Sequence, residues 1–210
     1  MNELTTSSER NKTSWILISI STMLTTSIIF WYFNNPEGFI VNGIGFRAEV
    51  FSTISIWVFS LFIISGYIAY TIIALPFVKA HLFTISWLKV IGIWAAIVTG
   101  IVEEVVFRHL LMEYLLTIGF SDVTQILISG ILFGIAHGVW LLLKRDWKFA
   151  LPAIISTTIL GSLLATLYIV ASRSTFAPIV AHILINMFIE PWLMLSAVSG
   201  KWDDNEKRTN

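Results

Sequence analysis

The residues of this 210-residue chain that could do chemistry lie inside apolar stretches. A charge at the middle of a bilayer costs from about 3 kcal/mol upward, so such a side chain needs a partner, a water-filled cavity or a function. Three short clusters fit this description: Glu-Glu-x-x-x-Arg at 103–108, Phe-x-x-x-His at 133–137 and His-x-x-x-Asn at 182–186. We expect the function of the chain to depend on them.

The first cluster combines two adjacent carboxylates with one guanidinium group. On an α-helix, Glu104 and Arg108 are four residues apart and can pair on one face, whereas Glu103 is rotated by about 100°. Two adjacent carboxylates also raise the free-energy cost of ionising both, so one of them could take up a proton, as a general base must. The alternative is a structural ion pair that fixes helix packing, although one glutamate would suffice for that.

The other two clusters place a histidine and a second residue on one helix face. His137 follows Phe133 by four residues, and His182 precedes Asn186 by four. Taken alone, His137 could be a satisfied interior histidine. Asn186 could equally join two helices by a hydrogen bond within the membrane.

Sequence spacing relates the first two clusters to each other. A polar turn near residues 119–122 is predicted to join two antiparallel helices, with Glu103 16 residues before Gly119 and His137 15 residues after Asp122. At about 1.5 Å per residue the two side chains reach similar depth. A stripe of small residues on the second of these helices also predicts the close approach of another helix. It consists of Gly130, Gly134 and Gly138.

Composition indicates that lipid surrounds these helices. Hydrophobic residues make up 56% of the chain and charged residues only 12%, against about 25% charged in soluble domains. A chain this short must still cover its surface, so one larger core cannot account for the deficit. The formal net charge of zero gives no indication of nucleic-acid binding, and the absence of cysteine excludes disulfides, Cys-ligated zinc and thiol catalysis.

Six hydrophobic passages are predicted to cross the bilayer, which takes about 20 residues each. They lie at about 14–33, 51–77, 82–117, 123–143, 149–171 and 176–199. The third is too long for one straight span, so it should be tilted or broken near Gly100. We therefore predict an all-α fold, a polytopic transmembrane helical bundle of six to eight helices. Its expected parts are a polar N-terminus at 1–13, a transmembrane domain at 14–199 and a polar tail at 200–210.

Basic residues outside these passages predict the orientation. Nine lysines and arginines lie on the side that holds both termini, against Arg47 and Arg173 on the other side. Because cytoplasmic loops carry the excess of basic residues, both termini should be cytoplasmic. The first passage lacks a small-residue cleavage site and is expected to be a retained span. Lys89, inside the third passage, is expected to extend its charge toward the interface.

The three clusters, in this order and each on its own apolar helix, resemble the CAAX protease and bacteriocin-processing family of intramembrane peptidases. This family, also called CPBP or Abi, includes the type II CAAX prenyl endopeptidases. The resemblance covers about residues 99–188. Members often have glycine directly after the arginine of the first cluster, where this chain has His109, a departure that could alter packing there.

The resemblance implies hydrolysis of peptide bonds. In the family's glutamate-peptidase description, the residue matching Glu103 activates water with help from the histidine matching His137, and the residues matching His182 and Asn186 stabilise the oxyanion. The candidate catalytic residues are therefore Glu103, Glu104, Arg108, His137, His182 and Asn186. This assignment requires side chains from all three clusters to converge on one hydrated pocket.

Members are also described as metalloproteases, so zinc stays a possible cofactor. Its ligands would then be Glu103, His137 and His182, because a zinc site takes about three N or O ligands and an open position. The chain lacks His-Glu-x-x-His, the usual helical zinc pattern. Water attack needs only a base, an oxyanion stabiliser and a proton for the leaving amine, and no cofactor is favoured.

The expected substrate is a peptide or a membrane-protein segment, and the expected surroundings are the lipids of a bacterial cell membrane. Prenylated C-terminal peptides, peptide pheromones, and bacteriocins or their leaders would all fit. A second function class is a non-catalytic membrane partner that regulates a sensor kinase, a transporter or a bacteriocin receptor. A third is a small ion-coupled carrier, since intramembrane Glu, His and Arg also mark ion relays, although repeated halves are not visible.

Overall fold

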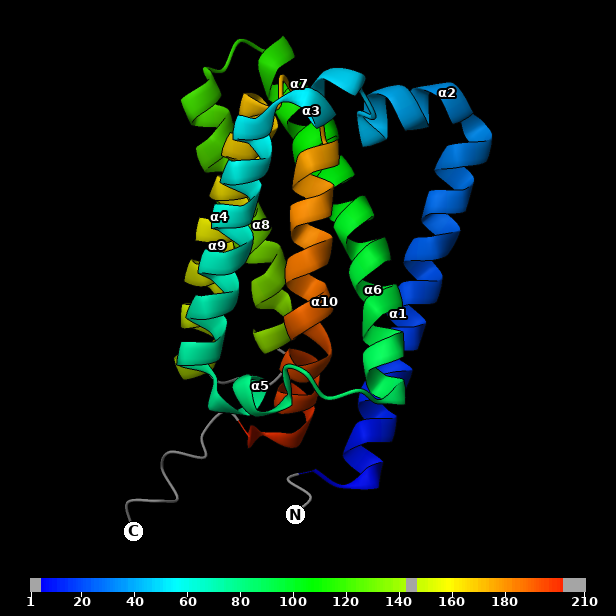
Figure 1. Ribbon diagram of the computed structural model, residues 1–210, viewed down its shortest axis with the longest axis vertical. Coiled ribbons are helices and arrows are strands. Elements are labelled where there is room, and N and C mark those ends of the chain that lie inside the picture. Colours follow the sequence, from blue (N-terminus) through cyan, green and yellow to red (C-terminus); the bar gives the residue numbers. More distant parts are fainter. Residues whose placement is uncertain (1–4, 143–146, 202–210) are drawn as a thin grey trace. The chain divides into compact units, whose positions relative to one another are not determined.

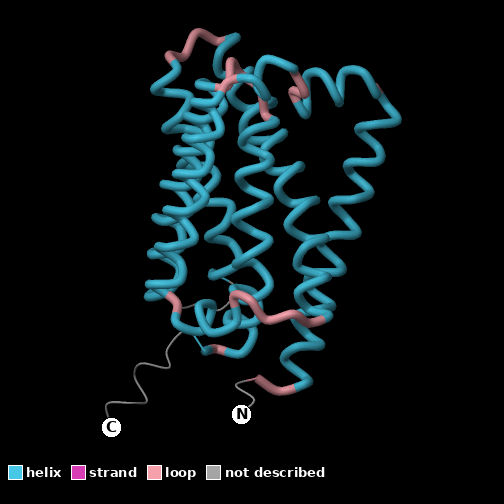
Figure 2. Tube along the Cα trace, in the orientation of Figure 1, coloured by secondary structure: helices cyan, strands magenta, loops and turns pink. Residues whose placement is uncertain are grey.

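The computed structural model describes residues 5–142 and 147–201, which are helical over most of their length and contain no strand (Figure 2). The elements, labelled as in Figure 1, are α1 Ser7–Asn34, α2 Pro36–Gly38, the π-helix η1 Phe39–Ile44, α3 Ala48–Ser52, α4 Ile54–Ala74, α5 Pro76–His81, α6 Trp87–Glu104, the π-helix η2 Val105–Leu110, α7 Leu111–Thr117, α8 Asp122–Leu142, α9 Trp147–Val170 and α10 Phe176–Ser199. The predicted all-α class is confirmed. The ends of the predicted terminal segments, residues 1–4 and 202–210, lie outside the described residues, as do the loop residues Lys144 and Arg145.

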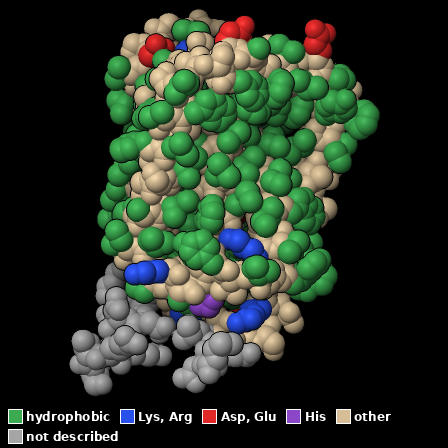
Figure 3. Space-filling model, viewed as in Figure 1, with side chains coloured by type: hydrophobic (Ala, Val, Ile, Leu, Met, Phe, Trp, Pro, Cys, Tyr) green, Lys and Arg blue, Asp and Glu red, His purple; other side chains and the backbone are tan. Residues whose placement is uncertain are grey.

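The helices have the length and polarity of membrane spans. Five helical segments of the described chain are long and apolar enough to cross a membrane: Ser7–Asn34, Ile54–Ala74, Trp87–Thr117, Ala150–Val170 and Phe176–Ser199. The fourth predicted passage forms the apolar helix α8. Large hydrophobic side chains are exposed along these helices and cover most of the face drawn in Figure 3. The chain is a multi-pass integral membrane protein.

The long third passage is one helical segment that changes its pitch. Of the two alternatives for this passage, a tilt or a break near Gly100, the break is wrong, because α6 continues through Gly100 to Glu104. A π-helical turn, η2, follows directly and leads into α7. π-Helical turns inside α-helices are frequent at functional sites. Here the turn contains Arg108, and its Phe107 carbonyl accepts a hydrogen bond of 3.1 Å from Ser129 Oγ of α8.

The segment after α1 is folded into the short elements α2, η1 and α3. Two hydrogen bonds join this segment to the residues that precede α10. Ser174 Oγ donates to the Gly45 carbonyl at 2.6 Å, and Thr175 Oγ1 donates to the Gly43 carbonyl. Gly45 has a φ of +68°, and a Cβ there would lie 2.8 Å from the Thr175 nitrogen, so glycine is required at this turn.

The chain divides into two compact units, which are described separately. One consists of Met1–Phe30, Ile64–Gly100 and His182–Asn210, and the other of Trp31–Ile63 and Ile101–Ala181. The first and second clusters belong to the second of these units. The third cluster, with His182 and Asn186, belongs to the first unit.

Within the second unit, α8 and α9 pack side by side through the small residues of α8. A Cβ added at Gly134 would lie 2.7 Å from the Ile154 carbonyl oxygen, and one added at Gly130 would lie 2.9 Å from the Ser162 nitrogen. Both distances are too short for a real Cβ. The close approach of another helix, predicted from the glycine stripe, is confirmed, and the approaching helix is α9.

Candidate active site

A buried ion pair fixes the helix that carries the first cluster. Arg108 Nε lies 3.0 Å from Glu104 Oε2, and both side chains are fully buried. The same guanidinium donates from Nη2 to the Gly161 carbonyl of α9 at 3.2 Å. Such a pair is tolerable in a low-dielectric interior only when further hydrogen bonds support it. The predicted pairing of Glu104 with Arg108 is confirmed.

Phe133 lies between this ion pair and the histidine of the second cluster. Its ring centroid is 4.8 Å from Arg108 Cζ and 4.4 Å from the His137 ring. Gly161 makes room for it, because a Cβ at that position would lie 2.9 Å from Phe133 Cβ. Gly161 was not among the predicted site residues. Its only signal was its place within residues 99–188, the range that resembles the family.

Glu103, near the end of α6, and His137 of α8 approach each other. Glu103 Oε2 lies 3.5 Å from His137 Nε2, and the two side chains are 25% and 30% exposed. This is the approach that equal distances from the turn at 119–122 predicted. Unlike Glu104 and Arg108, these two side chains are not fully buried.

A hydrogen bond to the backbone determines which nitrogen of the imidazole carries a hydrogen. His137 Nδ1 lies 2.9 Å from the Phe133 carbonyl, which can only accept, so Nδ1 carries the hydrogen. Nε2 then faces the Glu103 carboxylate, either as an acceptor in the neutral ring or as a donor in the protonated one. At 3.5 Å a bridging water is a natural link. The pair can therefore hold a water and pass a proton between carboxylate and imidazole.

The Phe-x-x-x-His arrangement by itself is not a catalytic signature, because the chain repeats it elsewhere. In α5, His81 Nδ1 lies 2.8 Å from the Phe77 carbonyl, and the two rings are 4.4 Å apart. This geometry follows from the helix, which places each imidazole over the carbonyl four residues earlier. The carboxylate opposite Nε2 is what distinguishes His137.

The third cluster lies on α10 in the first unit. His182 is buried, and Asn186 Nδ2 lies 3.5 Å from Thr99 Oγ1 of α6. Thr99 donates its own hydrogen to the Ala95 carbonyl at 2.9 Å, so its oxygen can only accept from Asn186. This fixes which end of the amide faces Thr99. The convergence of His182 and Asn186 with Glu103 and His137 stays a prediction.

Lys89 makes contacts that the sequence did not predict. Its half-buried side chain donates to the carbonyls of Met187 and, at 3.3 Å, Phe188 of α10. Its ammonium group also lies 5.5 Å from the centroid of the Phe188 ring. Lys89 therefore joins α6 to α10 within the first unit.

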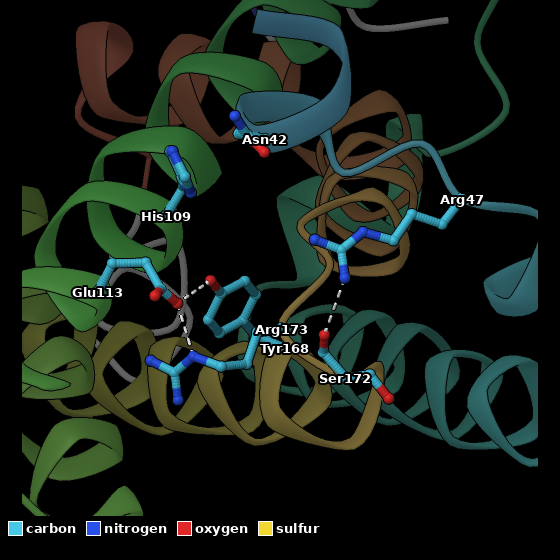
Figure 4. A pocket seen from close by; sticks show the side chains of 7 residues that line it. All are labelled: Asn42, Arg47, His109, Glu113, Tyr168, Ser172 and Arg173. Carbon is cyan, nitrogen blue, oxygen red and sulfur yellow. Dashed lines mark hydrogen bonds and ion pairs between the residues drawn. The ribbon is translucent and has the colours of Figure 1, made fainter. Parts of the chain in front are cut away.

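A separate polar cavity of about 290 Å³ lies in the second unit (Figure 4). It is lined by Asn42, Arg47, His109, Glu113, Tyr168, Ser172 and Arg173. None of the predicted catalytic residues lines it, whereas His109, the departure from the family pattern, does. Sequence reasoning missed this cluster, because its members come from three distant segments.

Glu113 and Arg173 form the centre of that cluster, as Figure 4 shows. Glu113 Oε1 accepts hydrogen bonds from Tyr168 Oη and Arg173 Nε, both at 2.6 Å. Arg173 Nη2 also reaches Gln125 Oε1 at 2.9 Å, which ties the turn after α9 to α7 and α8. Burial lowers the pKa of Arg173, but the hydrogen bond and charge of Glu113 outweigh it and raise that pKa above its ordinary value.

The donor set for a metal is incomplete at the Glu103–His137 pair. Among residues 5–142 and 147–201, no three His, Cys, Asp or Glu side chains are grouped as metal ligands. The pair supplies two N or O donors, whereas a zinc site takes about three and an open position. A zinc ion would need a further ligand there.

Comparison with known proteins agrees with the resemblance seen in the sequence. A family profile described as type II CAAX prenyl endopeptidase Rce1-like matches residues 85–188, a range that contains all three clusters. Neither a curated protein nor a solved structure matches the chain. The residues that match include the buried Glu104–Arg108 pair and the Glu103–His137 pair described above. Through residues 85–188, the chain belongs to the CAAX protease and bacteriocin-processing family of membrane endopeptidases, with an Rce1-like core.

Proposed function

We propose that the chain is an intramembrane endopeptidase in which Glu103 activates a water molecule for attack on a peptide bond. One observation carries this proposal: Glu103 Oε2 and His137 Nε2 lie 3.5 Å apart, and neither side chain is fully buried, inside an apolar helical protein. The family assignment supports the reaction class.

The residues divide the chemistry among them. Glu103 removes a proton from the water as its oxygen attacks the substrate carbonyl carbon, and the carbonyl oxygen becomes an oxyanion. Glu103 passes this proton to His137, and His137 delivers it to the nitrogen of the leaving amine as the C–N bond breaks. Asn186 Nδ2 and His182 would stabilise the oxyanion by hydrogen bonds. Arg108 holds the Glu104 carboxylate in an ion pair. Of the two adjacent glutamates, Glu103 alone then faces the water.

The proposed substrates are membrane-associated or lipid-modified peptides, among them prenylated C-terminal peptides and bacteriocins or their leaders. Access to such substrates from lipid is consistent with the large hydrophobic side chains exposed along the helices. The basic residues outside the spans support an orientation with both termini in the cytoplasm, here of a bacterial cell membrane.

We propose glutamate chemistry without a metal and test zinc as the alternative. If zinc were bound, it would polarise the scissile carbonyl and the attacking water, with Glu103, His137 and His182 as the residues to hold it. A zinc chelator separates the two mechanisms, because it should leave metal-free cleavage unchanged.

The test is cleavage of a peptide library by the chain purified in detergent, with products identified by mass spectrometry. Glu103→Gln should abolish cleavage, whereas the control Glu37→Gln, an exposed carboxylate in α2, should not change it. Full cleavage by Glu103→Gln would overturn the proposal. Absence of cleavage by the native chain would favour the non-catalytic membrane partner instead.

A further inference from the structure

Helix α10 contains a proline that interrupts its hydrogen bonds beside the third cluster. Pro191 lies inside α10 and has no N–H, so the carbonyl of Met187, four residues earlier, lacks its usual helical donor. A carbonyl without a donor is costly in an apolar environment. Met187 directly follows Asn186, so this gap adjoins a proposed oxyanion donor.

Lys89 of α6 supplies the missing donor. Its Nζ donates to the Met187 carbonyl and, at 3.3 Å, to the carbonyl of Phe188. The ammonium lies 5.5 Å from the Phe188 ring centroid and 6.0 Å from that of Trp192, where cation–π attraction also holds it. One lysine therefore occupies the gap that the proline leaves.

The face of α6 that carries Lys89 is shaped to α10 over several turns. A Cβ added at Gly92 would lie 2.7 Å from Pro191 Cβ, and one added at Gly100 would lie 2.7 Å from Ile183 Cγ1. Between these two contacts, Thr99 accepts the hydrogen bond of Asn186. Pro191, Gly92 and Lys89 therefore all belong to the same packed contact between α6 and α10.

We propose that Lys89 is a positioning residue for Asn186. Its ammonium group replaces the N–H that Pro191 lacks and fixes the α10 backbone next to the Asn186 amide. The Thr99 hydroxyl then orients the side chain on that fixed backbone. This inference rests on the proposed function, since it takes Asn186 as an oxyanion donor.

The expected effect of losing Lys89 is on kcat. Displacing a reacting or stabilising group by about 1 Å can cost about 100-fold in rate, and removing one oxyanion donor costs about 100- to 1,000-fold. Lys89→Met should therefore lower kcat by about 10- to 100-fold. KM should change by less than about threefold, because the ground-state contacts of the substrate are unaltered.

Restoring the backbone donor tests the mechanism directly. Pro191→Ala supplies an N–H for the Met187 carbonyl, so the double variant Lys89→Met/Pro191→Ala should recover kcat to within about threefold of the native value. Pro191→Ala alone should stay within about twofold, since its helix is complete without the lysine. The matched control is Lys79→Met, an exposed lysine of α5 that should have no effect.

A readout without substrate separates this inference from the proposed function. Hydrogen exchange of α10 amides around residues 184–195 should increase in Lys89→Met and return toward native in the double variant. If Glu103→Gln cleaves normally, the proposed function fails, while the exchange data still decide whether Lys89 completes α10. The inference would be overturned if the double variant recovered neither kcat nor hydrogen-exchange protection relative to Lys89→Met. It would also be overturned if Lys89→Met failed to fold and the double variant failed to fold as well.

Discussion

Glu103 Oε2 and His137 Nε2 lie 3.5 Å apart, although 34 residues separate them along the chain. The contact joins the end of α6 to α8, and the Phe133 carbonyl holds the other imidazole nitrogen at 2.9 Å. Neither residue is fully buried, in contrast to the ion pair beside them. Because the proposed base and the proposed proton carrier are two separate side chains, each can be tested by its own substitution.

Replacing His137 should remove the proton carrier while leaving the helix intact. We expect His137→Gln to lower kcat by about 100- to 10,000-fold, the usual contribution of general acid–base catalysis. His81→Gln is a matched control, because His81 makes the same contacts with Phe77 in α5. The measurement is cleavage of an identified peptide under identical detergent conditions. Equal losses in both variants would show that the effect is only structural.

Sequence reasoning succeeded where a side chain's place follows from counting along helices. Glu103 and His137 are equally far from one turn, so their approach could be predicted, and Glu104 and Arg108 pair because they are one helical turn apart. The same reasoning could not find the partner of Lys89, which is a carbonyl exposed by a distant proline. A backbone acceptor of that kind leaves no signal at the position of its donor.

The irregular part of the third passage also escaped prediction. Gly100 was the natural place for a break, yet it serves close packing against Ile183, and the π-helical turn occurs at Val105–Leu110, a run without glycine or proline. The extra residue in such a turn is accommodated by tertiary contacts, here including the Ser129 hydrogen bond to Phe107. Composition alone gives no means of locating it.

Breaking the buried ion pair should destabilise the protein more than removing it entirely. Arg108→Met leaves the Glu104 carboxylate buried without its guanidinium, and the loss of a buried partner costs about 3–5 kcal/mol. Glu104→Gln/Arg108→Met removes both charges and should recover much of this loss. Thermal unfolding in detergent measures each variant. A double variant less stable than Arg108→Met would contradict the expected role of the pair.

Removing Arg173 should lower stability without changing the chemistry. Arg173→Met loses the hydrogen bonds to Glu113 and Gln125, which we expect to cost about 2 kcal/mol. Arg47→Met, an exposed arginine with one hydrogen bond of 3.4 Å, is the control and should cost less than about 0.5 kcal/mol. Unfolding midpoints and kcat should be measured together. A large loss of kcat at unchanged stability would place this cavity in catalysis.

The same arginine contributes no pH dependence in the working range. Its pKa is raised in the folded protein, so its contribution to stability is present below the unfolded-state pKa and is lost only as the pH rises through the folded-state pKa. Both values lie far above neutral pH, since an arginine side chain stays protonated throughout the physiological range. The stability difference between native and Arg173→Met should therefore be the same at pH 6 and pH 8. A difference that changes between them would assign the effect to another titrating group.

Filling the space at Gly161 tests whether the packing behind the active pair is transmitted to it. Gly161→Ala would bring a Cβ to 2.9 Å from Phe133 Cβ, so Phe133 must move, and His137 is stacked on that ring. Overpacking of this kind costs about 1–3 kcal/mol, and the displaced imidazole should lower kcat by about 10-fold or more. Gly66→Ala in α4 is the control, because nothing lies within 4 Å of a Cβ there. Reduced stability with native kcat would mean that Phe133 does not position His137, and the Glu103 contact alone would then have to orient the imidazole.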